Sequence, residues 1–383
     1  MEYKLSDICF SITDGSHNPP SGGANSPYLM LSSKNIFDDK ITYDEPRYLN
    51  EEQFYAEHKR TNIIPGDVLM TIVGTVGRTA VVSEQTLAIT LQRSVAVLHP
   101  RMEICTSRYL MYLLRSRRAY FEAEAHGVAQ KGIYLKQLSD VRVNVPDIEK
   151  QQSVICILDK VQEIIRKRQN EISKLDDLIK ARFVEMFGDP EINPKGWDKG
   201  PLKDHAEVLV GYPFPSEGYS EKGVAIIGGY NLMQGYIQWD DSKHWPNETG
   251  YEQYLLQAND IVMAMDRPWV NGGFKIARVD ASYLPALLIQ RTACIRGKGL
   301  RQEFLHILLD SQRFAEHCNI TGSLVPHISN KDINSFQVIL PPMELQNDFT
   351  TFVSQVDKSK FVVQKSLDEA QLLFDSLMQQ YFG

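Results

Sequence analysis

Pro146-Asp147-Ile148-Glu149-Lys150-Gln151 is the stretch that decides the fold of this chain, because a segment of the same kind occurs twice. About 195 residues later it returns as Pro341-Pro342-Met343-Glu344-Leu345-Gln346. Each copy is followed by a row of apolar residues in alternating steps of four and three, which is typical of a coiled-coil seam. Two long rows at a fixed offset, each closing one half of the chain, indicate duplication of one unit.

The two rows predict long helices that pack on each other. Each helix would be about 55 Å long at ~1.5 Å per residue and, with a single apolar stripe, would not be stable alone. Antiparallel pairing predicts a pseudo-twofold, almost circular plan with one globular domain at each end. The predicted seam is Val154, Leu158, Val161, Ile165, Ile172, Leu175, Ile179 and Met186 in the first helix, and Phe349, Val353, Val356, Val363, Leu367, Phe374, Leu377 and Tyr381 in the second.

Three positions within these rows are basic rather than apolar. Arg168 and Arg182 interrupt the first row, and Lys360 interrupts the second. Their aliphatic stems can still cover apolar surface, although regular coiled-coil packing is not expected at these points.

The segments before the helices also repeat, as anchors in a constant order. The paired anchors are Leu5-Ser6-Asp7 with Leu202-Lys203-Asp204, Gly66-Asp67-Val68-Leu69-Met70 with Asn259-Asp260-Ile261-Val262-Met263, and Gln92-Arg93-Ser94 with Gln290-Arg291-Thr292. A helix then begins near Thr106 or Arg301. The chain is therefore predicted to be a mixed α/β protein. Its expected parts are a first domain (1–148), a first long helix (149–188), a linker and second domain (189–342) and a second long helix (343–383).

Composition is ordinary for a soluble globular protein, with 43% hydrophobic and 23% charged residues in 383. We find no long apolar run and no signal-peptide pattern at the N-terminus, and the five cysteines are scattered, so a reducing cytoplasm is expected. The net charge of −7 counts against a nucleic-acid binder without excluding one, because local basic patches matter more than the sum.

Several short matches to catalytic motifs are better explained as local structure. Asn18-Pro19-Pro20-Ser21 resembles a DNA methyltransferase signature but lacks the aromatic residue that stacks on a flipped base. The acidic residues around Pro146 suit the start of a helix. The sequence contains no phosphate-loop motif and no histidine pair at zinc-ligand spacing. No catalytic residue, metal site or cofactor is therefore predicted in this chain.

The order of these repeated motifs resembles that of the DNA specificity subunits of type I restriction–modification systems. The resemblance rests on two diverged halves, each with its Gly-Asp-Val-Leu or Asn-Asp-Ile-Val strand, its Gln-Arg-Ser/Thr strand and a Pro-x-x-Glu-x-Gln-type entry to a long helix. It implies two target-recognition domains that read a bipartite, asymmetric double-stranded DNA sequence. It also implies paired helices that set the spacer and dock two modification subunits, which methylate adenine N6.

The same resemblance implies that the chemistry lies in partner subunits. S-adenosylmethionine would be bound by the modification subunits, and ATP would be used by restriction/translocase subunits where these are present. Arginine and lysine suit guanine edges and phosphates, and asparagine and glutamine suit adenine edges. The predicted DNA contacts are Lys34, Asn35, Thr75, Arg78, Arg93, Lys131 and Tyr134 in the first domain, and Tyr230, Asn231, Arg267, Asn271, Lys275, Arg291 and His327 in the second.

Two other functions remain open from the sequence. A coiled-coil scaffold without DNA contact would share the long helices. A stand-alone DNA methyltransferase would need a methyl-donor fold for which no motif is present. Binding of DNA with a salt dependence, and binding of S-adenosylmethionine, separate these alternatives.

Overall fold

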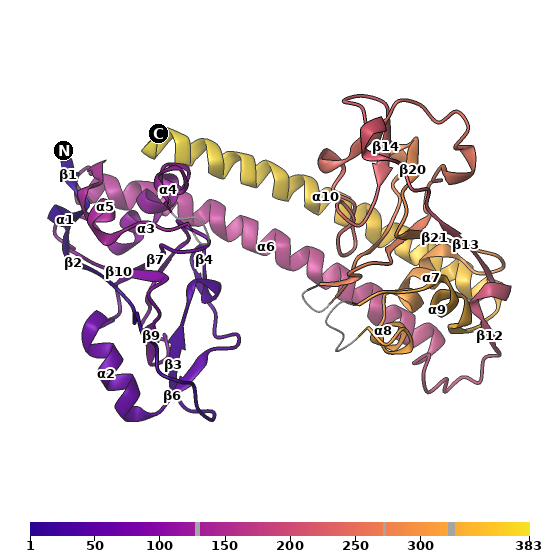
Figure 1. Cartoon of the computed structure of the whole chain (residues 1–383), viewed down its shortest axis with the longest axis horizontal. Coiled ribbons are helices and arrows are strands. Elements are labelled where there is room, and N and C mark those ends of the chain that lie inside the picture. Colours follow the sequence, from indigo (N-terminus) through magenta and orange to yellow (C-terminus); the bar gives the residue numbers. More distant parts are fainter. Residues whose placement is uncertain (127–130, 271–272, 321–325) are drawn as a thin grey trace. The chain divides into compact units, whose positions relative to one another are not determined.

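The computed structural model describes residues 1–126, 131–270, 273–320 and 326–383. The chain divides into two compact units, which we call unit 1 (Met1–Gln169 with Lys365–Gly383) and unit 2 (Asn170–Gln364). Two 40-residue helices, α6 (Ile148–Phe187) and α10 (Met343–Phe382), contribute to both units (Figure 1).

Unit 1 contains two larger sheets and two two-stranded ones. An antiparallel sheet has the order β2 (Cys9–Asp14), β10 (Val95–Pro100), β7 (Val68–Thr71), β8 (Thr79–Val81). A second sheet has the order β6 (Arg47–Leu49), β3 (Tyr28–Leu31), β9 (Ile89–Leu91), in which β3 and β9 are parallel. Strands β1 (Glu2–Lys4) and β11 (Arg142–Asn144) pair where the chain enters α6, and β4 (Ile36–Phe37) pairs with β5 (Lys40–Ile41).

Unit 2 repeats the strand order of the two larger sheets and of the β1–β11 pair, as the duplicated sequence anchors predict. Its four-stranded sheet is β13 (Ala206–Val210), β21 (Thr292–Gly297), β16 (Ile261–Ala264), β19 (Ile276–Arg278). Its three-stranded sheet is β15 (Lys243–Trp245), β14 (Val224–Ile227), β20 (Ala286–Leu288), again with one parallel pair. The two-stranded sheets are β12 (Lys199–Pro201) with β22 (Gln337–Ile339), and β17 (Trp269–Val270) with β18 (Gly273–Phe274).

Shorter helices accompany the sheets in both units. Unit 1 has α1 (Leu5–Ile8), α2 (Glu51–Thr61), α3 (Ser107–Ser116), α4 (Arg118–Glu124) and α5 (Leu135–Asp140), and unit 2 has α7 (Gln302–Leu309), α8 (Gln312–His317) and α9 (Asn330–Ser335). Short 3-10 helices span Ser33–Asn35, Leu202–Asp204, Ser216–Gly218, Trp239–Asp241, Glu252–Tyr254 and Ala281–Tyr283. In unit 1, α3, α4 and α5 gather beside α6, whereas α2 lies with the β6-β3-β9 sheet (Figure 1).

The long helices run antiparallel within each unit. In unit 1 the start of α6 (Val154, Leu158) shares one buried cluster with the end of α10 (Phe374, Phe382). In unit 2 the end of α6 (Phe183, Phe187) shares a cluster with the start of α10 (Phe349). Burial of each such large apolar side chain contributes about 1.5–3 kcal/mol, so the helices are held mainly by their apolar stripes. The predicted mixed α/β fold, with two similar domains and an antiparallel pair of long helices, is confirmed.

The seam follows the predicted rows, but its central positions are only partly buried and it shifts near the helix ends. Predicted residues that are buried are Val154, Leu158, Val161, Ile165, Ile179, Met186, Phe349, Val353, Val356 and Phe374. Those that are only partly buried are Ile172, Leu175, Val363, Leu367, Leu377 and Tyr381. In the last turns the most buried positions move by one residue, to Phe183 and Phe187 in α6 and to Met378 and Phe382 in α10. A helix of 3.6 residues per turn drifts from a strict 3.5-residue repeat, which accounts for this shift.

A glutamine near the start of each long helix ties that helix to the domain it follows. The fully buried Gln151 accepts hydrogen bonds from the Thr106 backbone N–H and hydroxyl at 2.9 and 3.2 Å, and its amide donates to the Ile104 carbonyl at 2.8 Å. Gln346 accepts from the Arg301 N–H at 2.9 Å in the same manner. The glutamine of the duplicated motif therefore joins the long helix to the N-cap of the preceding domain helix, α3 or α7.

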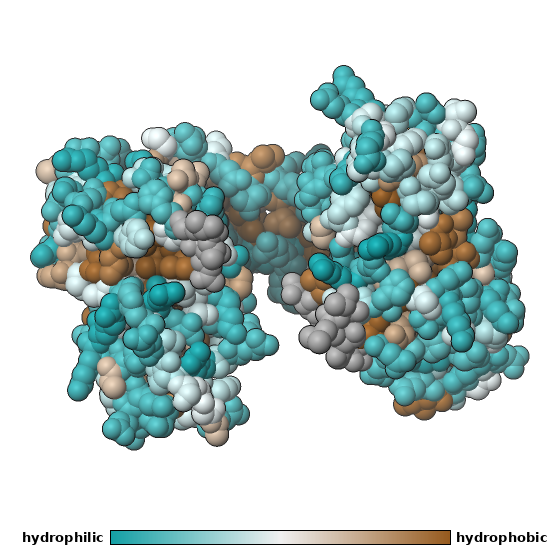
Figure 2. All heavy atoms as spheres, in the orientation of Figure 1, coloured by the Kyte–Doolittle hydropathy of each residue, from teal (hydrophilic) through white to brown (hydrophobic). Residues whose placement is uncertain are grey.

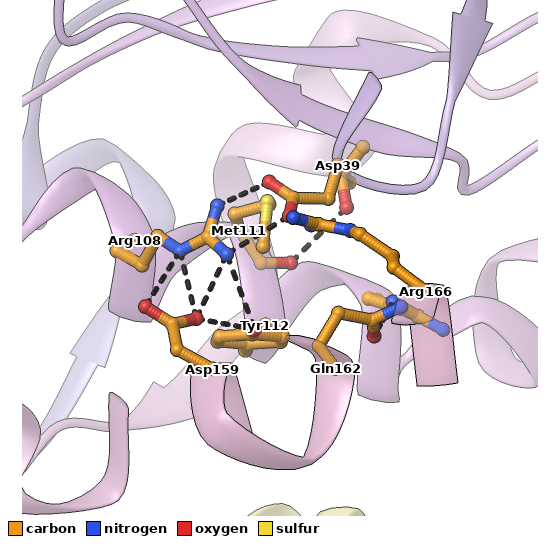
Figure 3. Close-up of polar contacts among 9 residues, drawn as sticks. Asp39, Arg108, Met111, Tyr112, Asp159, Gln162 and Arg166 are labelled. Atoms are coloured by element: carbon orange, nitrogen blue, oxygen red, sulfur yellow. Dashed lines mark hydrogen bonds and ion pairs between the residues drawn. The ribbon is translucent and has the colours of Figure 1, made fainter. Parts of the chain in front are cut away.

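Unit 1 has a second attachment, a charged network between α6, α3 and the β4–β5 turn (Figure 3). The Arg108 guanidinium donates to Asp159 on α6 at 2.8 Å and to Asp39 in the turn at 2.9 Å. The Tyr112 hydroxyl donates to Asp159 at 2.6 Å, and Arg166 also binds Asp39. Burial and the bond to Asp159 raise the pKa of Tyr112, so this hydroxyl keeps its proton. The β4–β5 turn is thus fixed directly to the long helix.

Candidate nucleic-acid interface

Loops that are distant in the sequence meet in unit 1. The Ile72 N–H, just after β7, donates to the Ser94 carbonyl at 2.9 Å, and the Gly74 N–H donates to the Lys131 carbonyl at 3.0 Å. The Ser33 N–H donates to the Ser94 hydroxyl at 3.1 Å. The segments that carry the predicted residues Lys34, Thr75, Arg93 and Lys131 therefore lie together, and these four residues are exposed.

The equivalent loops meet in unit 2. The Met265 N–H donates to the Arg291 carbonyl at 2.8 Å, and the Arg267 N–H donates to the Pro326 carbonyl at 3.0 Å. Asp266 and His327 form an isolated backbone bridge. The predicted residues Arg267, Arg291 and His327 thus lie together and are exposed. Asn271 lies outside the described residues. The face of each unit drawn in Figure 2 is largely hydrophilic.

The predicted match between the two Gln-Arg motifs is wrong by one residue. The N–H of Gln92 donates to the Leu31 carbonyl, and in unit 2 the N–H of Ile289 donates to Ile227 in the same place. Arg93 therefore corresponds to Gln290, and Ser94 corresponds to Arg291. Both motifs lie at the turn that connects two strands, rather than within a strand. Arg291 takes the left-handed conformation there, with φ of 63°.

Another pair of predicted residues does correspond. The Thr71 N–H donates to the Arg78 carbonyl at 2.9 Å, and the Ala264 N–H donates to the Lys275 carbonyl at 2.9 Å. The Arg78 guanidinium lies 4.9 Å from the centre of the Phe37 ring, a cation–π contact that holds it over the β4–β5 hairpin. The Lys275 ammonium donates to the Gly229 carbonyl, and partial burial lowers its pKa.

Asn35 and Asn231 shape their turns and do not offer their amides to solvent, which corrects the prediction that they contact bases. Both are buried, with exposed fractions of 1% and 0%. The Asn35 side-chain oxygen accepts from the Ser32 N–H at 3.1 Å, and that of Asn231 accepts from the Gly228 N–H at 2.9 Å. Each side chain mimics a backbone turn, which is a common role of asparagine. The same residue is thus used for the same structural purpose in both units.

The two predicted tyrosines differ in exposure and in the hydrogen bonds of their hydroxyls. Tyr134 is 68% exposed, at the N-cap of α5 and close in sequence to Lys131. The Tyr230 hydroxyl donates to the Ile226 carbonyl at 2.7 Å and accepts from the Lys243 N–H at 3.1 Å. Burial raises the pKa of Tyr230 to about 12, so the hydroxyl stays protonated. Tyr134 is therefore available for stacking, whereas the hydroxyl of Tyr230 is already engaged.

One charged residue among these loops is absent from the predicted set. Asp266 follows β16 and binds Arg291 Nη1 at 2.8 Å and His327 Nδ1 at 2.5 Å. Its only signal in the sequence is its position shortly after a buried strand. Unlike Asp266, the exposed charged residues that we predicted in these loops are cationic. Lysine and arginine are the groups that bind phosphates and guanine edges. No cluster of possible metal ligands occurs among the described residues. Within the same part of the chain, no helix is long and apolar enough to cross a membrane.

Comparisons with known proteins agree with this architecture. A family model described as "Type I restriction modification DNA specificity domain" matches residues 25–174. The EcoAI specificity subunit of Escherichia coli is 34% identical over 197 residues, which cover 48% of this chain but only 33% of that subunit. The MjaVIII specificity subunit of Methanocaldococcus jannaschii is 22% identical over 299 residues, covering 73% and 70% of the two chains.

Two solved structures share the fold over the full length. The type I restriction–modification S subunit from M. genitalium aligns with a TM-score of 0.55 and 13% identity, covering 100% of this chain and 96% of that one. A chain from a structure on complex assembly of the type I R-M system aligns with a TM-score of 0.51 and 15% identity, covering 100% and 97%.

Proposed function

Because the chain belongs to the family of DNA specificity subunits of type I restriction–modification systems, we propose that it selects the DNA sequence on which the other subunits of such a complex act. Each unit reads one half of a bipartite, asymmetric target in double-stranded DNA. The chain itself acts through recognition and contributes no catalytic residue.

The observation that carries this proposal is one scaffold, built twice, with different side chains on its equivalent loops. The strand order is the same in both units. At matched loop positions, Arg78 corresponds to Lys275, Arg93 to Gln290, Ser94 to Arg291 and Gly132 to His327. Two similar units with different side chains on their loops suit a target whose halves differ in sequence. Each base edge in the major groove requires its own pattern of donors and acceptors.

The residues that we propose to contact DNA are the exposed or half-buried polar residues of these loops. They are Lys34, Thr75, Arg78, Arg93, Lys131 and Tyr134 in unit 1, and Tyr230, Arg267, Lys275, Arg291 and His327 in unit 2. Lysines suit phosphates, which position the protein, and arginines suit guanine edges, which specify the sequence.

The long helices are proposed to hold the partner subunits and to set the spacing between half-targets. Apolar side chains point outward from them, including Phe361 (73% exposed) and Val362 (66% exposed) on α10 and Ile164 (45% exposed) on α6. Two modification subunits, which would bind S-adenosylmethionine and methylate adenine N6, would cover such residues. Restriction subunits that use ATP would join where they are present.

A domain exchange tests the proposal. Residues 1–148 are replaced by the equivalent domain of a relative, and methylated adenines are sequenced in cells that contain the matching modification subunit. One half of the methylated motif should change and the other should stay the same. A change in both halves, or in neither, would contradict independent reading by the two units.

A heptad insertion tests the spacing. Seven residues added to both α6 and α10 lengthen each helix by about 10 Å and preserve the seam. The half-targets should then separate by roughly three base pairs at ~3.4 Å each, with their sequences unchanged. DNA bending can absorb part of the accompanying rotation at some energetic cost. An unchanged spacer in an active complex would show that the helices do not set this distance.

Two simpler assays separate this function from the alternatives. A coiled-coil scaffold would give no salt-dependent shift of DNA in the presence of the modification subunit. A stand-alone methyltransferase would bind S-adenosylmethionine without a partner, whereas the purified specificity subunit should not.

A further inference from the structure

The loops of unit 2 contain a group of three linked ionisable side chains at positions where the equivalent residues of unit 1 are not ionisable. Asp266 Oδ2 lies 2.8 Å from Arg291 Nη1, and Asp266 Oδ1 lies 2.5 Å from His327 Nδ1. Each residue comes from a different loop, so the group exists only in the folded chain. The matched backbone hydrogen bonds and bridges place at the equivalent positions of unit 1 the non-ionisable residues Val73, Ser94 and Gly132.

Stability alone does not explain this group. The side chains of Arg291 and His327 are 72% and 56% exposed, and ion pairs at such sites contribute little to folding. The backbone is nevertheless held by hydrogen bonds between the loops, because the Met265 N–H donates to the Arg291 carbonyl at 2.8 Å and the Arg267 N–H donates to the Pro326 carbonyl at 3.0 Å. Arg291 and Arg267 both take left-handed conformations, with φ of 63° and 45°. Residues other than glycine keep such conformations only where their surroundings impose them. The arginine that bears the exposed guanidinium is therefore fixed at its backbone and again at Nη1.

The donor groups of Arg291 and His327 that Asp266 does not bind are suited to recognising a base. With Nη1 bound to the carboxylate, the Nε and Nη2 edge of Arg291 still offers two parallel donors. Paired donors of this kind suit the O6 and N7 acceptors of guanine. His327 donates through Nδ1, which leaves Nε2 for a second partner.

We propose that Asp266 is a positioning residue for sequence reading by unit 2. It holds the Arg291 guanidinium and the His327 imidazole in place before DNA arrives, so that less side-chain freedom is lost on binding. Its negative charge also repels backbone phosphates, which Arg291 would otherwise bind at any sequence. This inference rests on the proposed function and adds that the half-target read by unit 2 includes a guanine contacted by Arg291.

Removal of the Asp266 charge should change the affinities for cognate and unrelated DNA in different directions. In Asp266→Asn, affinity for the cognate target should fall by about 2- to 10-fold, the range expected when one arginine loses its preorganisation. Affinity for an unrelated duplex should stay the same or rise, because a negative charge near the phosphates has gone. A purely structural defect would instead lower both affinities.

The experiment uses the complex of this chain with its modification subunit. Its probes are a duplex with the bipartite motif found by sequencing methylated adenines, the three alternative base pairs at each position of the unit 2 half, and a scrambled duplex. Asp204→Asn is the matched control, because Asp204 is exposed in unit 2 and its change removes the same charge outside these loops. Asp266→Asn should relax discrimination at one base pair of the unit 2 half and none of the unit 1 half.

A double-mutant comparison tests whether Asp266 acts on specificity through Arg291. If Asp266 acts by holding this arginine, Asp266→Asn should have much less effect on specificity in an Arg291→Ala background. Unchanged discrimination in Asp266→Asn, or equal loss of cognate and scrambled binding, would overturn the inference. If the wild-type complex does not distinguish its motif from the scrambled duplex, the proposed function itself fails.

Discussion

The side-chain oxygen of Gln151 lies 2.9 Å from the backbone nitrogen of Thr106 and accepts its hydrogen bond. Thr106 is the N-cap of α3, so one side chain on α6 satisfies an N–H that has no partner within its own helix. Gln346 and Arg301 repeat this relationship at 2.9 Å in unit 2. Attachment of the long helix to its domain is thus a duplicated polar contact made by a buried glutamine.

Gln151→Ala should destabilise unit 1. The substitution leaves the Thr106 N–H and the Ile104 and Pro146 carbonyls without their side-chain partner, and a buried unsatisfied group costs about 1–3 kcal/mol. Urea unfolding followed by circular dichroism measures the loss. The neighbouring Gln152→Ala is the control, because Gln152 is exposed and should leave the midpoint unchanged. Equal midpoints for both variants would contradict an anchoring role for Gln151.

Arg108→Ala should also weaken unit 1, by about 2 kcal/mol, because hydrogen bonds to charged groups contribute more than neutral ones and two carboxylates would lose a shared cation. Asp39 in the β4–β5 turn and Asp159 on α6 both pair with the Arg108 guanidinium (Figure 3). Without this arginine the two carboxylates would repel each other. Proteolysis within the β4–β5 turn should become faster. Lys167→Ala removes an exposed pair with Glu163 on the same helix and serves as the control. Loss of stability of the same size in both would argue against a special role for the network.

The His99–Asp67 pair should make the stability of unit 1 depend on pH at a position where unit 2 has a pair that does not titrate. His99 Nδ1 lies 2.6 Å from Asp67 Oδ1 and its Nε2 lies 2.9 Å from the Thr61 carbonyl, so both ring nitrogens face acceptors. The hydrogen bond to Asp67 raises the pKa of His99 above its ordinary 6.5. The corresponding pair in unit 2 is Arg296 with Asp260, at 2.7 Å, which does not titrate in this range.

The sign of the pH effect follows from the raised pKa. The stabilisation of unit 1 by the hydrogen bond between protonated His99 and Asp67 is complete below 6.5, the pKa of His99 in the unfolded chain. It is lost as the pH rises through the higher pKa of His99 in the folded chain. The stability difference between wild type and His99→Gln should therefore shrink as the pH is raised above this point. NMR titration of the imidazole gives the folded pKa directly, and Asp67→Asn should lower it. A His99 that titrates at or below 6.5 would contradict this prediction.

Arg78→Ala should weaken DNA binding by the assembled complex. Loss of a bidentate base contact costs about 1–3 kcal/mol and relaxes one position, whereas loss of a phosphate contact weakens all sequences and flattens the salt dependence. Affinity measured at several salt concentrations separates the two roles. Arg142→Ala is the control, because Arg142 is exposed on β11 and pairs with Glu2. Wild-type affinity and methylation pattern in Arg78→Ala would remove this residue from the interface.

Much of this architecture is readable from the amino-acid sequence. The duplicated Pro-x-x-Glu-x-Gln segments and the apolar rows behind them predict two long helices, because helical periodicity is a local property of the chain. The repeated Asp-Val-Leu and Asp-Ile-Val strands predict two similar sheets, since buried strands appear as short apolar runs. Lys34, Arg93, Arg267 and Arg291 are likewise exposed, Lys34 in a short 3-10 helix and the other three in loops.

Only the tertiary structure decided which loop residues are equivalent and which remain accessible. Matching cross-strand hydrogen bonds within the two units show that Arg291 is equivalent to Ser94 and not to Arg93, because register depends on contacts between segments distant in sequence. Burial turns Asn35 and Asn231 into turn-formers, since a buried amide must satisfy its hydrogen bonds within the fold. Asp266, Arg291 and His327 meet because three separate loops converge, a long-range relationship that no local pattern encodes.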